Sequence, residues 1–173
     1  MEPDTDLDPQ ANQPAHEIIP RLWLGNKAAA LEQDWLRHHN IDVVFNATKD
    51  LPFANVAKRQ YRVPVDDNLE PDEIYNMAQW APEIIYNVLK EYNAGNNILI
   101  HCFAGMQRSA AIVAMTLIVL KQMKTDEAIA AIKEKRRIAF YPGANFYRSI
   151  QDFERYYYSY LIPLLRGETP TQA

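Results

Sequence analysis

The distribution of apolar and polar residues along the chain follows two alternating patterns. Short runs of apolar residues occur at 41–48, 60–65 and 96–102, and each has the length of a buried strand. Longer segments lie between and after them, such as 72–93, in which apolar residues recur every three or four positions. That spacing is typical of a helix with one buried face. We therefore predict an α/β domain in which helices pack on a central, mostly parallel sheet.

The same criteria predict the remaining elements, with a proline or a capping residue at several ends. Pro82 is expected to kink the helix of 72–93 or to divide it in two. Thr125 is expected to be the N-cap of the helix that follows it, and Pro163 to end the last helix. The remaining predicted elements are strands at 18–19 and 22–24 and helices at 27–39, 108–122, 126–136 and 145–165.

The two ends of the chain differ in composition from its centre. Residues 1–16 are rich in Asp, Pro, Gln and Asn, so we expect a disordered, acidic and Pro-rich tail there. The chain has 173 residues, enough for one hydrophobic core. We therefore expect one folded domain over 17–165 and a flexible C-terminus over 166–173.

Charge and cysteine content exclude several classes of protein. The net charge of -4 gives no overall attraction to nucleic acid or to an anionic membrane. No stretch reaches the ~18 apolar residues of a membrane span, and the first residues lack the apolar core of a signal peptide. A single cysteine fits a reducing compartment, and no cluster of His, Cys and carboxylate residues suggests a metal. We expect an intracellular, cytoplasmic protein without a metal or other cofactor; the oligomeric state is not indicated.

The one cysteine lies in the segment "ILIHCFAGMQRSAAIVAM", between a predicted strand and a predicted helix. Ligands gather where loops join the carboxyl ends of parallel strands to helix N-termini, and the N–H groups there can bind an anion. Gly105 allows the tight loop, and the Arg108 guanidinium suits two oxygens of a phosphate. The same positive field favours the thiolate of Cys102, so this cysteine is a candidate nucleophile. A buried core cysteine is the alternative.

The pattern His101-Cys102-x-x-Gly105-x-x-Arg108-Ser109 resembles the signature of the cysteine-dependent protein tyrosine phosphatases. It is most similar to the dual-specificity branch, in the small atypical type that consists of the catalytic domain only. Four further stretches resemble the same family, namely "IIPRLWLGNKAAA", "IDVVFNATKD", "DEAIAAIKEKRR" and "YPGANFYRSIQDFE". The resemblance covers roughly 17–158 and implies the cysteine-phosphatase fold. Gly143 is a departure, because the family often has asparagine after the proline.

The resemblance also implies a role for individual residues. Cys102 would be the nucleophile, and Ser109 would hydrogen-bond its sulfur and ease its departure from the phosphocysteine. His101 would hold the loop and tune the thiolate, and Asn46 would brace the cysteine loop. The phosphate would be bound by Phe103, Ala104, Gly105, Met106, Gln107 and Arg108. Arg136 and Arg137 are interpreted without the resemblance. They are cations favoured at the C-terminal end of a helix, or they form a basic rim near a phosphorylated substrate.

The general acid is expected in "RVPVDDNLEPDE", because a leaving oxygen needs a proton donor and a carboxylic acid can serve. The family generally places this aspartate three residues after a proline, which selects Asp67. Asp66 is the alternative if the loop is shifted by one residue, and Asp72 comes after it.

Three functions remain open from the sequence. The resemblance favours a dual-specificity protein phosphatase that hydrolyses phosphotyrosine and phosphoserine or phosphothreonine monoesters through a phosphocysteine, with a phosphoprotein as its partner. The same chemistry on RNA 5′-phosphates or phosphoinositides is a second reading. Relatives that act on phosphoinositides tend to have lysines in the loop, and 103–107 has none. A catalytically silent phosphoprotein-binding module is the third, although such proteins usually lack the cysteine or the arginine.

Overall fold

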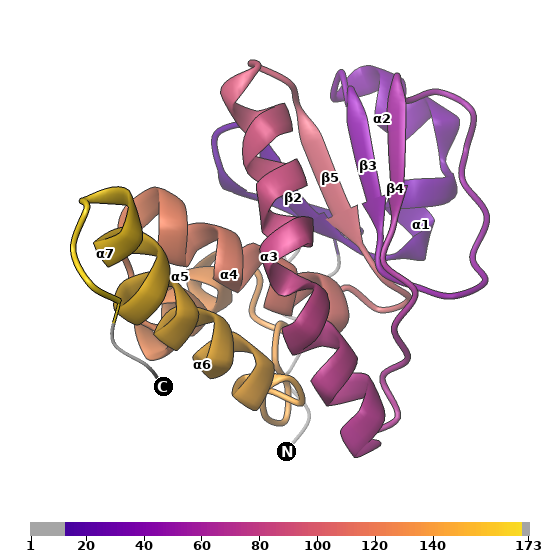
Figure 1. The fold of residues 1–173 in the computed structure, drawn as a ribbon. Helices are drawn as coiled ribbons and strands as arrows, with labels where there is room; N and C mark the ends of the chain where they lie inside the picture. Colours follow the sequence, from indigo (N-terminus) through magenta and orange to yellow (C-terminus); the bar gives the residue numbers. More distant parts are fainter. Residues whose placement is uncertain (1–12, 171–173) are drawn as a thin grey trace.

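A computed structural model, which describes residues 13–170, contains a five-stranded sheet in the order β1-β2-β5-β3-β4 (Figure 1). β1 is antiparallel to β2, and the other neighbouring strands are parallel. The predicted α/β class with a mostly parallel sheet is therefore confirmed. The strands are β1 Ala15–Ile19, β2 Leu22–Gly25, β3 Val43–Asn46, β4 Arg59–Arg62 and β5 Ile98–His101.

Helices cover both faces of this sheet. Successive side chains of a strand point to opposite faces, and β5 shows both environments. Ile98 and Ile100 belong to the large core beneath α3, α4, α5 and α6, whereas Leu99 packs with Leu36 in a smaller core beneath α1 and α2. The helices are α1 Lys27–Leu31, α2 Gln33–His38, α3 Pro71–Asn93, α4 Arg108–Lys121, α5 Thr125–Lys135 and α6 Tyr147–Tyr156.

Several elements differ from the sequence prediction in their limits. The expected helix at 27–39 is two helices, because Glu32 between them has an extended backbone. Pro82 lies inside α3, which runs on as one helix. Thr125 is the first residue of α5 and Lys124 is the N-cap. The Thr125 hydroxyl has no hydrogen-bond partner within residues 13–170, and the Thr125 N–H donates to Glu154 Oε1 over 2.7 Å.

The ends of the folded part also differ. β1 begins at Ala15, inside the segment expected to be a tail, because this residue pairs with Gly25 and is buried. Most of the expected tail, 1–12, lies outside the described residues. The last predicted helix is α6 followed by a π-helical segment, η1 Tyr157–Leu161, and by α7 Ile162–Leu165, which contains Pro163 near its start.

The arrangement of strands brings three carboxyl ends together. Gly25 of β2 and Asn46 of β3 both pair with His101 of β5. The connections that follow these residues therefore leave the sheet side by side, and the loop from β5 leads directly into α4.

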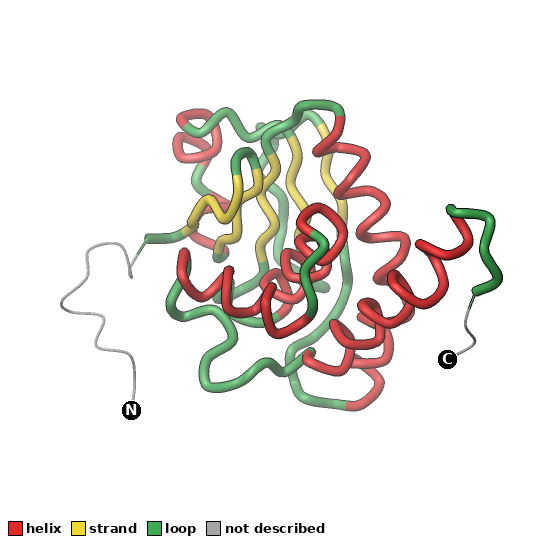
Figure 2. Tube along the Cα trace, turned by 90° about the vertical axis from the view of Figure 1, so that its left-hand side faces the viewer, coloured by secondary structure: helices red, strands yellow, loops and turns green. Residues whose placement is uncertain are grey.

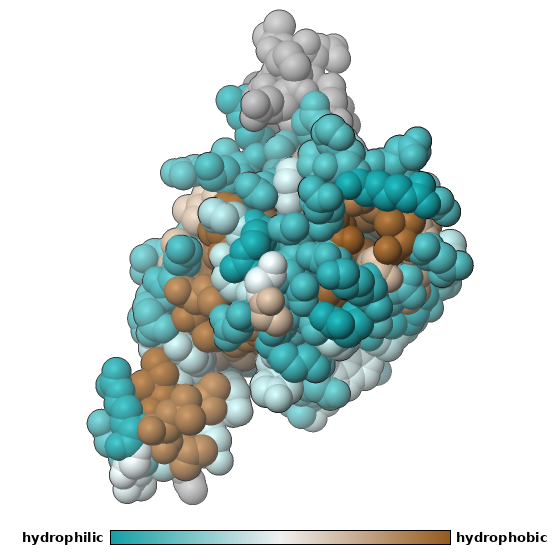
Figure 3. All heavy atoms as spheres, turned by 90° about the horizontal axis from the view of Figure 1, so that it is seen from above, coloured by the Kyte–Doolittle hydropathy of each residue, from teal (hydrophilic) through white to brown (hydrophobic). Residues whose placement is uncertain are grey.

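The outer surface adds two observations. Turned by 90°, the molecule shows the two ends of its described part on opposite sides (Figure 2). Seen from above, apolar residues gather over the C-terminal η1 and α7 (Figure 3), where Tyr160, Leu164 and Leu165 are exposed. Among residues 13–170, no helix has the length and apolar character required to cross a membrane.

Candidate active site

The cysteine loop, residues 102–107, joins β5 to α4 and places the thiol near the N-terminus of that helix. Cys102 is buried, with 2% of its surface exposed. Gly105 has φ +66, and a Cβ there would lie 2.6 Å from the backbone of Gly25 and 2.8 Å from Nη2 of Arg136. A side chain at this position would therefore clash on two sides, and the tight loop requires glycine. The N-terminus of α4 adds its positive dipole end to the loop.

The surroundings of Cys102 favour its ionised form. Its Sγ lies 3.1 Å from the Oγ of Ser109, in the first turn of α4. Burial by itself raises the pKa of the thiol. The Ser109 hydroxyl and N–H, the Arg108 charge and the Gly105 N–H together outweigh burial and hold the pKa of Cys102 below its usual value. The thiolate is the nucleophilic form of cysteine, so this environment activates the sulfur.

The Arg108 guanidinium is hydrogen-bonded through Nη1, whereas its Nε lacks an acceptor in the described part of the chain. Its Nη1 donates to the carbonyl of Val65 over 3.0 Å, which fixes the side chain across the loop. Its Nε is buried and has no hydrogen-bond partner within residues 13–170. A buried N–H without an acceptor is costly, and an oxyanion bound beside Cys102 would satisfy it. The side chain is thus arranged to receive an anionic ligand.

A cavity of about 290 Å³ opens over the sulfur and brings most of the predicted site together. Asp67 lines it, and the Oδ1 of this aspartate accepts a hydrogen bond from Nδ2 of Asn145 over 2.8 Å. At the rim, Phe103 is half exposed and carries the ammonium of Lys27 4.1 Å from its ring centroid. The lining residues are Asp67, Cys102, Phe103, Ala104, Met106, Gln107, Arg108, Tyr141 and Asn145.

Asp66 and Asp72, the alternatives for the acid, lie elsewhere. The Asp66 carboxylate pairs with the ammonium of Lys49 over 3.1 Å, and its backbone N–H donates to Oε2 of Glu73. Glu73 is buried and also pairs with Lys49, over 2.6 Å. Asp72 lies in the first turn of α3. Of the three aspartates, Asp67 is the one that lines the cavity.

His101 is buried directly behind the loop. Its Nδ1 lies 3.2 Å from the carbonyl of Cys102, and 1% of its surface is exposed. Burial lowers the pKa of His101 to about 4, so the ring is neutral at pH 7. A neutral ring can donate one N–H to that carbonyl, which fits the predicted role in holding the loop.

Asn46 lies beside His101, the residue before Cys102, and its side chain is hydrogen-bonded within the turn that follows β3. Its side-chain Nδ2 donates to the carbonyl of Leu51, and its Oδ1 accepts from the N–H and hydroxyl of Thr48. These bonds organise the turn after β3. The link to the loop is made by the backbone, because the Ala47 N–H donates to the carbonyl of His101 over 2.8 Å.

Arg136 is the residue that sequence reasoning missed. Its side chain is fully buried behind the cysteine loop, where Nε donates to the carbonyl of Gly105 and Nη2 to that of Ala104. Burial lowers the pKa of Arg136 to about 10, so it remains a cation at pH 7. These bonds fix the backbone of the cysteine loop from the side opposite the solvent. The pair "RR" was a signal, but only the fold shows which arginine turns inward; Arg137 is exposed.

Gln107 connects the cysteine loop to the segment that carries Asn145. Its Nε2 donates to the carbonyls of Tyr141 and Gly143, over 3.1 and 2.8 Å. Its Oε1 accepts the N–H of Asn145 over 3.0 Å. Since Asn145 donates to Asp67, a chain of hydrogen bonds runs from the loop to the Asp67 carboxylate.

Comparison with known proteins agrees with this geometry. The family model for the dual specificity phosphatase catalytic domain matches residues 22–156. Human dual specificity protein phosphatase 1 is 32% identical over 80% of this chain and 36% of its own length. Protein 123R of Invertebrate iridescent virus 6, which bears a tyrosine phosphatase name, is 32% identical over 81% of this chain and 92% of its own.

The fold has relatives among solved structures as well. The crystal structure of DUSP15 superposes with a TM-score of 0.75 and 25% identity, covering 91% of this chain and 98% of that one. The chain spans about a third of the length of the human dual specificity relatives, with 36% and 34% of phosphatases 1 and 4 covered. The matched region contains the cysteine loop, Asp67 and Arg136.

Proposed function

Since the chain belongs to the family of dual specificity phosphatase catalytic domains, we propose that it hydrolyses phosphotyrosine, phosphoserine and phosphothreonine monoesters of proteins through a phosphocysteine intermediate. One observation carries the proposal. A buried thiol with a lowered pKa lies beside an arginine whose buried Nε lacks an acceptor, within a cavity that also holds a carboxylate. A thiol, an arginine and a carboxylate thus lie around one small volume, which supports the proposal.

In the first step, the Cys102 thiolate attacks phosphorus and the bond from phosphorus to the ester oxygen breaks. Arg108 and the loop N–H groups bind the three equatorial phosphoryl oxygens, over which charge is spread in the transition state. Asp67 in its protonated form gives its proton to the leaving oxygen, so that an alcohol departs. The products of this step are phosphocysteine and the dephosphorylated side chain.

In the second step, water attacks the phosphorus of the phosphocysteine. Asp67, now a carboxylate, accepts a proton from this water, and the bond from phosphorus to sulfur breaks. The sulfur leaves as a thiolate, which the Ser109 hydroxyl stabilises from 3.1 Å. Inorganic phosphate is released and the starting protonation states are restored.

Phosphoprotein is proposed over phosphoinositide and RNA 5′-phosphate because Phe103–Gln107 contribute no charged side chain to the loop. A silent binding module is not proposed, because Cys102, Arg108 and Asp67 are all present at the cavity. We further propose an intracellular, cytoplasmic enzyme, since Cys102 must stay reduced to act.

The test is a substrate panel on the parent chain, with Cys102→Ser and Arg108→Lys as variants. The panel consists of phosphotyrosine and phosphothreonine peptides, a phosphoinositide and an RNA 5′-triphosphate. We expect both phosphopeptides to be hydrolysed fastest. Cys102→Ser should bind the phosphopeptides without turnover, and Arg108→Lys should lose most activity because an ammonium lacks the two-pronged guanidinium. Cys102→Ser activity within tenfold of the parent, or a preference for lipid or RNA, would refute the proposal.

A further inference from the structure

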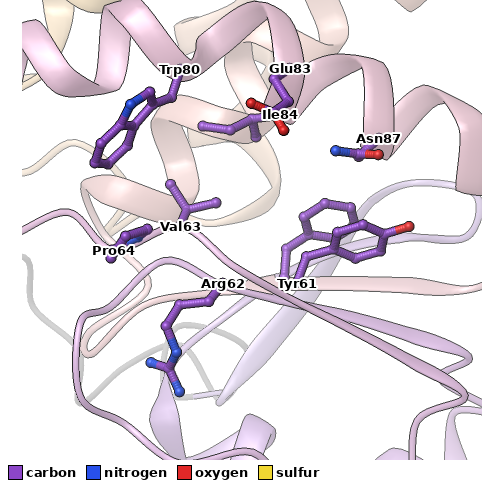
Figure 4. A pocket seen from close by; sticks show the side chains of 9 residues that line it. Tyr61, Arg62, Val63, Pro64, Trp80, Glu83, Ile84 and Asn87 are labelled. Atoms are coloured by element: carbon purple, nitrogen blue, oxygen red, sulfur yellow. The ribbon is translucent and has the colours of Figure 1, made fainter.

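A second cavity, of about 280 Å³, lies between the edge strand β4 and helix α3 (Figure 4). One wall is formed by Trp80, Glu83, Ile84 and Asn87, whose spacing places them on one face of α3. Residues 61–64, from the end of β4 and the segment after it, form the opposite wall. We call this cavity the β4–α3 groove.

The groove combines aromatic surface with a free carboxylate. Figure 4 shows Trp80 and Tyr61 on opposite sides of the space, with Glu83 above it. The Tyr61 ring is held flat against Phe45, with centroids 4.5 Å apart, and Trp80 is 36% exposed. No hydrogen bond or ion pair engages the Glu83 carboxylate within residues 13–170.

The one cation of the groove does not neutralise Glu83. Arg62 points away from the space in Figure 4, and its guanidinium donates to the carbonyls of Thr48 and Leu51 over 3.0 and 2.8 Å. The same guanidinium lies 4.9 Å from the ring centroid of Phe53. The groove therefore offers two aromatic walls and a negative charge, and its chemistry is complementary to a cation.

We propose that the β4–α3 groove binds an arginine or lysine side chain of the phosphoprotein substrate. The inference rests on the proposed function, which supplies such a substrate. The aliphatic stem of a long basic side chain packs against aromatic rings, and its charged end is attracted to a ring face and to a carboxylate. An acidic side chain would meet Glu83 with the same charge, and an apolar one would leave that carboxylate without a partner.

The position of the groove sets the expected spacing in the substrate. Pro64 lines the groove and Asp67 lines the active-site cavity. Three peptide units separate them, so their Cα atoms are at most about 11 Å apart. An extended peptide covers that distance in three or four residues, and an arginine side chain adds further reach. We therefore expect the basic residue about three to six positions from the phosphorylated one.

The test uses pairs of phosphotyrosine peptides that differ only in arginine against citrulline, its neutral analogue. The pair is made at each spacing from three to six, on either side of the phosphotyrosine. At the preferred spacing the parent should show a kcat/KM about five- to tenfold higher for arginine, the size expected of a cation–π contact with an ion pair. The arginine peptide should have the lower KM, and the two peptides should have the same kcat.

Variants locate the effect. Glu83→Gln and Trp80→Leu should remove the preference for arginine, whereas Glu134→Gln, an exposed acid on α5, should retain it. All three should hydrolyse p-nitrophenyl phosphate at the parental rate, because the groove lies outside the reacting atoms. That rate separates failure of the groove from failure of the phosphatase chemistry.

Three outcomes would overturn the inference. The first is an equal kcat/KM for the arginine and citrulline peptides at every spacing, in a protein that still hydrolyses p-nitrophenyl phosphate. An undiminished preference in both groove variants would place the recognition elsewhere. If Glu83→Gln instead changed the sedimentation coefficient without changing the preference, the groove would bind a second copy of this chain.

Discussion

Asp66 and Asp67 are adjacent and carry the same functional group, but their partners differ. Asp66 is paired with Lys49, and its backbone is held by Glu73. Asp67 has one carboxylate oxygen hydrogen-bonded to Asn145, which leaves the other available at the cavity. From the sequence alone, either of these adjacent residues could face the active-site cavity, and only the fold shows which one does. The residues that make their surroundings different are distant in sequence: Glu73 in α3, Lys49 in the turn after β3 and Asn145 in the segment after α5.

Replacing the two aspartates separately should distinguish them. Asp67→Asn should slow hydrolysis of a phosphothreonine peptide by roughly 10²-fold or more, because an alkoxide leaving group requires a proton. The loss should be smaller for p-nitrophenyl phosphate, whose leaving group requires little protonation. Asp66→Asn should leave the ratio of the two rates near parental. A leaving-group dependence in Asp66→Asn but not in Asp67→Asn would reverse the assignment.

Ser109 is predicted to set the pH at which Cys102 becomes active. Its hydroxyl and backbone N–H help to hold the pKa of Cys102 below its usual value, so Ser109→Ala should raise that pKa. The rising limb of kcat/KM should then move to higher pH by about one to two units, the worth of a hydrogen bond to a charged group. The pH dependence of alkylation by iodoacetate measures the same ionisation directly. An unmoved midpoint in both measurements would contradict this role.

At the scale of elements, the local sequence pattern predicted which helices and strands exist better than it predicted where each begins and ends. The strand at 98–101 and the helices at 71–93 and 108–121 follow from runs and spacings that the sequence displays. The break at Glu32 does not, because apolar residues on both sides keep a helical spacing while the backbone turns extended. Nor could local pattern indicate that Arg136 reaches the cysteine loop, since that contact joins residues 31 positions apart.

The Arg136 contact with the cysteine loop supports a prediction. Arg136→Lys keeps the charge but cannot donate to both Ala104 and Gly105 with the same geometry, and a buried carbonyl loses its partner. We expect about 2 kcal/mol less stability in urea unfolding. Turnover should fall roughly 10- to 100-fold through misplacement of the loop. Arg137→Lys is the matched control at the exposed neighbour, and equal effects at both positions would refute the role.

At the scale of the molecule, the class of fold was predictable and the surroundings of the site were only partly so. Alternating strands and helices implied a mostly parallel sheet, and a loop at a strand end implied a ligand site. Strand order was not implied, because it depends on which strands pair across the sheet. Order decides that Asn46 lies beside His101 while its side chain turns to Leu51, and that β4 is left at the edge beside α3.

Burial of His101 gives the whole fold a dependence on pH. An unfolded histidine takes up a proton near pH 6.5, but His101 stays neutral in the fold until about pH 4. The unfolded state therefore binds more protons between these values, and stability falls as the pH drops through them, by about 3 kcal/mol from this group. Urea unfolding of the parent and of His101→Asn between pH 7 and 4 measures this difference. A parallel pH dependence in both proteins would contradict it, and the exposed His38→Asn should behave as the parent.

The lone thiol on the floor of the cavity has a consequence for oxidative stress. Peroxide converts a thiolate to a sulfenic acid and releases hydroxide, and a low pKa speeds the reaction. Cys102 has no second cysteine in this chain with which the sulfenic acid could condense. A disulfide can then form only with an external thiol, which enters a space of about 290 Å³, forms a mixed disulfide with loss of water, and is displaced by a second thiol. Without such a reductant the sulfur is open to irreversible sulfinic acid formation, so the supply of small thiols would govern how long inactivation lasts.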